Sequence, residues 1–208
     1  MTEINYLNLL ITIVVIYLIA AIPFGYYIGL MYGVDLSKTG SGSTGATNVM
    51  RNVGKWQALL VLILDALKGF VPIFYLKNFS TYLSADANIF LAMFLLFLPL
   101  FAHTKSVYIG FKGGKSSATA LGVLFAINWI IGLVIISTWA VTVTLSGISS
   151  LGSIVSGPLV PVLMWIFKED ALYRYFGIIA FIFIVFVKHR SNIFRLIRGE
   201  EYNFKDKH

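Results

Sequence analysis

The segment KTGSGSTGATNVMR, Lys38 to Arg51, is rich in residues that can close a backbone around a phosphate. Its glycines follow the spacing G-x-G-x-x-G, and glycine lets successive backbone N–H groups turn toward one anion. The dinucleotide-binding version of this spacing also needs a preceding strand, which the surrounding apolar sequence does not predict. The segment therefore predicts an anion-binding loop, and a merely flexible turn is the alternative. The candidate substrate-binding residues in it are Gly40, Gly42, Gly45, Thr47 and Asn48.

A second loop, AHTKSVYIGFKGGKSSAT, has a similar composition farther along the chain. Two lysines flank two glycines there, and serines follow at the expected start of a helix. Lysines near a helix start oppose the helix dipole, so a bound phosphate would offset both positive charges. The loop predicts a second anion site, and a basic loop that only sets the membrane topology is the alternative. Its candidate residues are Lys112, Gly113, Gly114 and Lys115.

The C-terminal segment KHRSNIFRLIRGEE combines a potential base with a polar partner. A short helix would place His189 and Asn192 on one face, because they are three residues apart. Histidine is the side chain best suited to accept a proton near neutral pH, and an asparagine can hold a hydroxyl or fix the ring tautomer. The alternative is a basic stretch that binds acidic lipid beside the membrane.

Two ionisable residues, Asp65 and Lys68, lie inside the apolar sequence ALLVLILDALKGFVPIFYL. A charge inside a membrane span is unfavourable unless it is paired, and it usually marks function. Because the two are three residues apart, a helix would also let them form an ion pair that orients the span. Both interpretations stay open.

No metal site or cofactor is expected, since the three histidines are scattered and have no carboxylates at ligand spacing.

The composition places these segments in an integral membrane protein. Of the 208 residues, 58% are hydrophobic and 12% are charged, against about 25% charged in soluble domains. Only short loops and a tail separate the apolar runs, so we expect a single integral-membrane domain over residues 1–208. Cysteine is absent, which excludes a disulfide framework and a thiolate nucleophile. The apolar runs lie near residues 6–31, 56–76, 87–101, 118–145, 151–167 and 172–187.

The run 118–145 decides the number of spans. As one helix it would be about 42 Å long, too long for one span of a hydrocarbon core about 30 Å thick and short for two. If it turns near Asn128, twelve of the sixteen lysines and arginines lie on one side and three on the other, with Lys68 inside the membrane; a single span would leave eight against seven. The positive-inside rule favours the turn. We therefore expect an all-α protein with about seven transmembrane helices, the N-terminus outside and the C-terminus in the cytoplasm.

The order of these segments resembles the acyl-phosphate-dependent glycerol-3-phosphate acyltransferases of bacterial membranes, the PlsY family. GVDLSKTGSGSTGATNVMRNVGK with LDALKGFVP looks like the first block of that family, FKGGK with ATALGV like the second, SSLGSI like its serine loop and HRSNIFRLIRGEE like the third. The similarity extends from about Gly33 to Glu201. The resemblance implies catalytic roles for His189, Asn192 and Ser41, and it adds Arg51, Ser150 and Glu201 to the substrate-binding residues.

The chain departs from the pattern of this family at several positions. The second block usually has glycine, proline and glycine where this chain has Ala102, Ser106 and Ser116. An asparagine is common in the first block where Ser43 stands, and a basic residue often lies ahead of the serine loop where this chain has Gly147. These differences bear on substrate affinity, and they fit a diverged paralogue as well as a fully active enzyme.

The resemblance implies the transfer of an acyl group from acyl phosphate to glycerol 3-phosphate, giving lysophosphatidic acid and phosphate in phospholipid biosynthesis. Two anion-binding loops on the cytoplasmic face of a bacterial inner membrane would hold the two phosphates, and the lipid bilayer would hold the acyl chain. An enzyme that forms acyl phosphate is an expected functional partner, and nucleic acid is not. A transporter for a phosphorylated or other anionic solute is the main alternative, although no inverted repeat is apparent. A non-catalytic scaffold that holds acidic lipids is the third.

Overall fold

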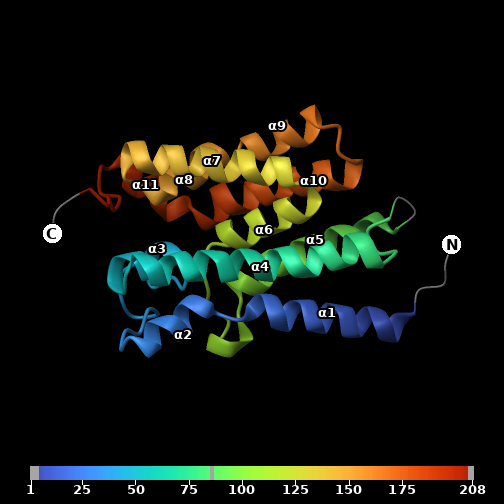
Figure 1. Ribbon diagram of the computed structural model, residues 1–208, viewed down its shortest axis with the longest axis horizontal. Coiled ribbons are helices and arrows are strands. Elements are labelled where there is room, and N and C mark those ends of the chain that lie inside the picture. The colour runs from blue at the N-terminus through green and yellow to red at the C-terminus, as the bar shows by residue number, and fades with distance from the viewer. Residues whose placement is uncertain (1–4, 85–86, 206–208) are drawn as a thin grey trace. The chain divides into compact units, whose positions relative to one another are not determined.

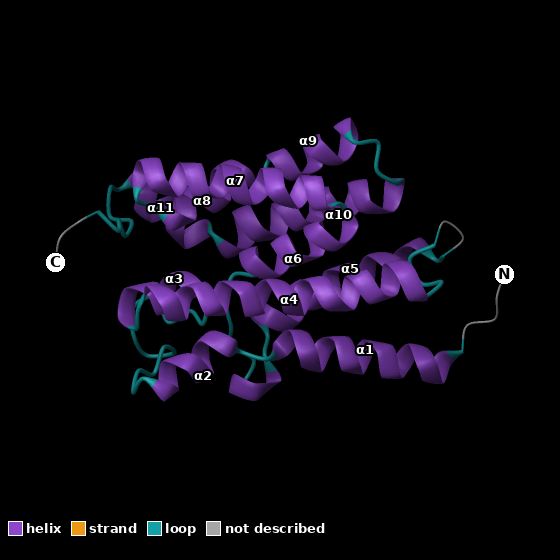
Figure 2. Cartoon of the chain, viewed as in Figure 1, coloured by secondary structure: helices purple, strands orange, loops and turns teal. Residues whose placement is uncertain are grey.

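The computed structural model describes residues 5–84 and 87–205, and the regular elements in these ranges are helices (Figure 1, Figure 2). The same ranges contain one isolated antiparallel bridge, between Ser106 and Lys112. The contacts divide the chain into two compact units, the first ending at Ile127 and the second beginning at Asn128. The all-helical fold class is thereby confirmed, and the expected single domain stays a prediction.

The first unit is built around the long helix α4, which packs against α3 and α6, while α1 packs against α5. Figure 1 shows α1, α4 and α5 as long rods within this unit. The elements are α1 (Tyr6–Ala21), α2 (Phe24–Met31), α3 (Ala46–Asn52), α4 (Lys55–Phe79), α5 (Ile89–Thr104), the 3₁₀-helix η1 (Val107–Ile109) and α6 (Ser117–Ile127).

The first apolar run is not one continuous helix. α1 ends at Ala21 and α2 begins at Phe24, because Pro23 has no backbone N–H to donate and its ring clashes with a continuing helix. The Nζ atom of Lys68 on α4 donates to the Ile22 carbonyl at this break, at 2.7 Å. A charged side chain from another helix therefore stabilises the interruption.

Two glycines allow α4 and α6 to touch along their backbones. A Cβ atom on Gly69 of α4 would collide with the carbonyl of Thr119, and one on Gly122 of α6 would collide with the backbone of α4. Small residues at such contacts are the usual means by which membrane helices pack closely. Farther along α4, Lys77 donates to the Ile127 carbonyl at the end of α6. These contacts make α6 parallel to α4, and α6 begins beside the middle of α4.

The second unit consists of helices that run back and forth between two ends. α7 packs against α8 and α9, and α9 packs against α10. The elements are α7 (Trp129–Ser146), α8 (Ser149–Ser156), α9 (Leu159–Ile166), α10 (Ala171–Phe181), the π-helix η2 (Ile182–Lys188) and α11 (Arg190–Ile197).

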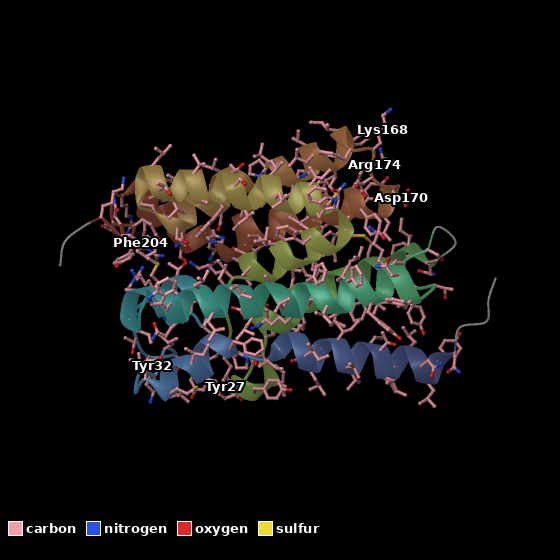
Figure 3. All side chains as sticks on the ribbon, viewed as in Figure 1. Tyr27, Tyr32, Lys168, Asp170, Arg174 and Phe204 are labelled. Carbon is pink, nitrogen blue, oxygen red and sulfur yellow. The ribbon has the colours of Figure 1, made fainter. Side chains whose placement is uncertain are left out.

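Hydrogen bonds define the two ends of the second unit. At one end Asn128 Nδ2 donates to Glu169 Oε1 at 2.7 Å, which joins the start of α7 to the connection between α9 and α10. At the other end Phe204 N donates to the Gly147 carbonyl at 2.8 Å, so the tail folds back onto the end of α7. Figure 3 shows this separation within the unit, with Asp170 labelled near the first end and Phe204 near the second.

The apolar run 118–145 is interrupted near Asn128, where a turn was expected, and the reversal of the chain across the membrane at this point stays a prediction. α6 ends at Ile127 and α7 begins at Trp129, and Asn128 Oδ1 caps α7 by accepting from Ile130 N at 2.9 Å. α5 and α6 are apolar but shorter than a membrane span. The segments long and apolar enough to cross a membrane are Tyr6–Met31, Lys55–Phe79, Trp129–Ser146, Ser149–Ile166 and Ala171–Lys188. The structure thus supports a protein with several spans, and the number seven stays a prediction.

Candidate active site

One buried side chain, Asn48, organises the glycine loop. Its Nδ2 group donates to the carbonyls of Thr39 and Ser43 at 3.0 and 2.8 Å, and its Oδ1 accepts from Ser41 N at 3.2 Å. The side chain amide has both donors and an acceptor, so it can bind several segments of the loop backbone that do not pair with one another. Asn48 is only 2% exposed. Its position is that of a loop organiser, and its expected contact with substrate stays a prediction.

The glycines of this loop have distinct local roles. Gly40 has a φ of 61° and Gly42 a φ of 68°, in the left-handed region that side chains rarely adopt. A Cβ atom on Gly40 would also collide with the side chain of Asn48. Gly45 has an extended backbone and immediately precedes α3. The first two glycines therefore shape the loop, and the third leads into the helix.

The remaining candidates of the glycine loop differ in exposure. Ser41 is exposed at the loop surface, whereas Thr47 and Arg51 on α3 are partly buried. At the entrance of the loop, Ser37 Oγ donates to Asp35 Oδ1 at 2.6 Å. This hydrogen bond holds the pKa of the Asp35 carboxyl below its ordinary value. The loop is therefore anchored by a carboxylate that stays ionised at neutral pH.

The second loop packs on His103, which lies in the last turn of α5. A Cβ atom on Gly113 would collide with the His103 carbonyl, and one on Gly114 would collide with Nε2 of the imidazole. The same carbonyl accepts from Gly114 N at 3.3 Å. Lys112 is exposed and Lys115 is partly buried. Glycine is required here because the loop backbone lies directly against His103, whatever the lysines bind.

In the second unit, three donors converge on the carboxylate of Glu201. Ser150 Oγ and Asn192 Nδ2 donate to its Oε1 at 3.0 and 2.7 Å, and Arg195 Nε donates to its Oε2 at 2.8 Å. The Glu201 side chain is 7% exposed, while that of Arg195 is 39% exposed. The carboxylate therefore connects the serine loop to α11 and to the tail.

The imidazole of His189 is held by the π-helix that precedes it. In a π-helix the hydrogen bonds skip one residue more than in an α-helix, and His189 N accordingly donates to the Ile184 carbonyl at 3.1 Å. The ring Nδ1 lies 2.8 Å from the same oxygen. Because a carbonyl oxygen only accepts, Nδ1 carries the proton in the neutral ring and Nε2 has the lone pair. His189 is 3% exposed.

The ion pair expected from the spacing of Asp65 and Lys68 is confirmed, with Lys68 Nζ 2.7 Å from Asp65 Oδ1. His103 joins it, its Nδ1 lying 3.7 Å from the same carboxylate oxygen. Sequence reasoning missed this third member, since no spacing rule relates His103 on α5 to Asp65 on α4. A histidine next to an apolar helix end was the one available signal.

Over the described residues, no group of three or more His, Asp or Glu side chains is placed to hold a metal ion.

The sequence-predicted residues thus fall into two sets. The glycine loop and the second loop belong to the first unit, and the serine loop and the tail belong to the second. Within the second unit the structure brings Ser150, Asn192 and Glu201 into contact. Within the first unit each loop is supported separately, by Asn48 and by His103.

A family model described as "Glycerol-3-phosphate acyltransferase" matches residues 10–199. The chain belongs to the glycerol-3-phosphate acyltransferase family. A protein of that name from Trichodesmium erythraeum is 40% identical over 205 residues, which cover 92% of this chain and 90% of the relative. Another from Synechococcus elongatus is 41% identical over 188 residues, which cover 89% of each chain.

Two solved structures of the family are also similar. One is the crystal structure of PlsY, an integral membrane glycerol 3-phosphate acyltransferase, in its glycerol 3-phosphate form; it is 34% identical with a TM-score of 0.85, covering 95% of this chain and 96% of that one. The lysophosphatidic acid form of PlsY gives 34% identity and a TM-score of 0.82, over 94% and 95% of the two chains. The resemblance drawn from the sequence blocks is therefore confirmed.

Two departures from the family pattern are offset by local contacts. Ser116 has a φ of 65°, a conformation suited to the glycine usual in the family, but its Oγ donates to the Leu100 carbonyl at 2.6 Å. Ser106 N donates to the Lys112 carbonyl at 3.0 Å, a bond that the usual proline could not make. Both serines therefore give the second loop hydrogen bonds that the family residues lack.

A third departure changes how the serine loop begins. Gly147 ends α7 with a φ of 77°, and a Cβ atom there would collide with the side chain of Asn203. Asn203 Nδ2 donates to the Ser146 carbonyl at 3.2 Å. The glycine therefore permits the tail to pack against the end of α7.

Proposed function

We propose that the chain transfers an acyl group from acyl phosphate to glycerol 3-phosphate, giving lysophosphatidic acid and inorganic phosphate. The hydroxyl oxygen of glycerol 3-phosphate attacks the acyl carbonyl carbon. The bond between that carbon and the phosphate oxygen breaks, phosphate leaves with the bonding electrons, and the hydroxyl proton passes to a base. Membership of the family, together with the named glycerol 3-phosphate and lysophosphatidic acid forms of the similar PlsY structures, supports this reaction.

The observation that carries the proposal is the contact of His189 Nδ1 with the Ile184 carbonyl at 2.8 Å. A base for the hydroxyl proton needs a lone pair, and the contact of Nδ1 with the Ile184 carbonyl leaves that lone pair on Nε2. Asn192 lies one turn along α11 and is held by Glu201. In this role a positioned base raises the reaction rate by about 10²- to 10⁴-fold. If the phosphate of the substrate takes the proton instead, His189 orients the hydroxyl and the effect of its loss moves to KM.

The two loops of the first unit are the proposed phosphate-binding elements. Arg51 and Lys115 supply positive charge, Ser41 supplies an exposed hydroxyl, and the shaped glycine backbones supply N–H groups. A charge-assisted hydrogen bond contributes about 1.5–3 kcal/mol. Holding two phosphorylated substrates in register supplies about 7–11 kcal/mol of the barrier reduction, which suits a donor that is already activated.

Ser150 and Glu201 were expected to bind substrate, and their contacts support a second role. The Glu201 carboxylate already accepts from Ser150, Asn192 and Arg195. We therefore assign Glu201 to positioning Asn192 and the serine loop, with direct substrate contact as the competing assignment.

We further propose seven spans in a bacterial inner membrane, with the N-terminus outside, the C-terminus in the cytoplasm and the reaction on the cytoplasmic face. The charge bias of the loops supports this topology. Because the chain has no cysteine, single cysteines at Gly42, Ile148 and Arg190, which are exposed or partly exposed, can be labelled without background. All three should react from the cytoplasmic side, and labelling of position 190 opposite to position 42 would contradict the topology.

The reaction is tested with purified protein, radiolabelled glycerol 3-phosphate and acyl phosphate. Lysophosphatidic acid should form with acyl phosphate and not with an acyl thioester, because the departing phosphate is the group that the anion sites recognise. A thioester-only activity would contradict the donor. Uptake of glycerol 3-phosphate into proteoliposomes without acylation would favour the transporter instead. An enzyme that makes acyl phosphate is the expected functional partner.

A further inference from the structure

The second loop of the first unit lies beside the middle of the long helix α4 and not beside one of its ends. Asp65, which faces His103, is ten residues beyond the start of α4, or about 15 Å along a helix that rises 1.5 Å per residue. α6 begins beside Gly69, also near the middle of α4. The irregular backbone between α5 and α6 therefore lies part-way along a membrane-spanning helix. Such backbone is tolerated at membrane depth only where protein or water satisfies it.

A single ammonium group satisfies two acceptors at this level. Lys68 Nζ lies 2.7 Å from Asp65 Oδ1 and donates to the Ile22 carbonyl at 2.7 Å. The Asp65 and Lys68 side chains are each 2% exposed. The Ile22 carbonyl is the one beside the break between α1 and α2. The ion pair therefore connects two backbone interruptions, the break in the first apolar run and the end of α5.

The imidazole of His103 fills the space between the ion pair and the second loop. Its Nδ1 edge faces Asp65 Oδ1 at 3.7 Å, and its Nε2 edge lies against Gly114 so closely that a Cβ there would collide. Its carbonyl also receives the Gly114 N–H at 3.3 Å. A ring packed on both edges transmits the position of the carboxylate to the loop backbone.

We propose that Asp65, Lys68 and His103 form a polar hub that positions the second loop for phosphate binding. This inference rests on the proposed function, because it adds a positioning device to the proposed phosphate site. The hub residues touch no reacting atom in this scheme. They set where the backbone at Gly114 lies, and Lys115 follows it directly. The hub also gives the buried charges in the LDALKGFVP segment a role beyond orienting α4.

The first test is hydrogen exchange of residues 105–116 in the purified full chain, compared among wild type, His103→Ala and Lys77→Met. Lys77→Met is the matched control, because it removes another ammonium that links α4 to the backbone of α6, at the end away from the loop. Exchange of the loop should rise roughly tenfold or more in His103→Ala, since a packed ring and its contacts are lost. It should stay near the wild-type rate in Lys77→Met. Equal exchange in wild type and His103→Ala overturns the hub.

The second test is a double-mutant cycle between His103 and Gly114. Gly114→Ala should raise the KM of one phosphorylated substrate by roughly tenfold while kcat changes less, because the new methyl group displaces the loop from the ring. In the His103→Ala background the same substitution should have a clearly smaller effect, since the ring is gone. Equal effects in both backgrounds would mean that Gly114 acts without His103, and the hub would be wrong.

The two proposals fail separately. If wild-type protein forms no lysophosphatidic acid but the exchange pattern appears, the hub stands and the proposed reaction fails. If wild type is active and His103→Ala changes neither exchange nor KM, the reaction stands and the hub fails. If His103→Ala is not recovered as folded protein, exchange in Gly114→Ala decides, because it leaves all three hub residues in place; an unchanged rate at 105–116 overturns the hub.

Discussion

Replacing Glu201 by alanine removes an acceptor that three donors share. Ser150 and Asn192 are buried, and each loses the hydrogen bond that it donates to Glu201, at a cost of about 1–3 kcal/mol. The Arg195 side chain is 39% exposed and can turn to solvent, so its contact adds no more than about 1 kcal/mol. Glu201→Ala should therefore destabilise the protein by about 2–7 kcal/mol, which lowers the melting temperature by at least roughly 4 °C at about 2–4 °C per kcal/mol for a chain of this size.

The matched variant is Glu201→Gln, which keeps the oxygen that accepts from Ser150 and Asn192. It should lose mainly the Arg195 contact, or about 1 kcal/mol, and should retain most of the activity. Thermal unfolding in detergent and steady-state kinetics of both variants check this order. The reasoning is refuted if both variants melt like wild type while the KM for glycerol 3-phosphate rises in each. Glu201 would then contact substrate, as the sequence first suggested.

Three other predictions follow from single side chains. Arg51→Ala and Lys115→Ala should each lower kcat/KM by roughly tenfold or more through loss of a charge-assisted contact, and unchanged steady-state kinetics in both would remove the anion-site argument. Ser116→Gly should alter the melting temperature little, because relief of about 1 kcal/mol of strain in the left-handed backbone offsets the lost hydrogen bond to the Leu100 carbonyl. Ser116→Ala should lower the melting temperature, because it loses the bond and keeps the strain. Equal melting temperatures for the two variants would contradict this balance. Asn48→Ala should raise hydrogen exchange throughout residues 36–45 by at least roughly tenfold, and protection at the wild-type level would show that the loop does not depend on it.

Local features of the fold could be predicted from the sequence because they depend on neighbours along the chain. The helix break at Asn128 follows from span length and loop charge, and the residue then caps α7. The pair of Asp65 and Lys68 follows from helical spacing. The break at Pro23 falls inside a run that was expected to be one span, because hydropathy alone does not register a missing N–H donor.

Contacts between distant segments could not be predicted, because side chain type does not identify the partner. From the sequence alone Asn48 could be a substrate ligand or a loop organiser; its bonds to the loop carbonyls show the second role, and contact with substrate stays a prediction. The same holds for Glu201, whose three donors come from separate segments. His103 lies between Asp65 of α4 and the second loop, and no periodicity in the sequence predicts that position.

The π-helix before His189 had no signal in the sequence. IFIVFVK is an ordinary apolar run, and nothing in its composition indicates the shift to longer-range hydrogen bonds. That shift places the Ile184 carbonyl beside both the backbone N–H and the ring of His189. The candidate base could therefore be named from its residue type, but its tautomer could not.

The most direct test of the central claim is the rate of lysophosphatidic acid formation by His189→Ala at saturating acyl phosphate, measured beside wild type in monodisperse detergent preparations. If His189 accepts the hydroxyl proton, kcat should fall by about 10²- to 10⁴-fold, with one phosphate released for each lysophosphatidic acid formed by the residual activity. If His189 orients the hydroxyl, the KM for glycerol 3-phosphate should rise more than kcat falls. A variant that keeps the wild-type kcat and KM would contradict the account, because neither role for His189 would remain.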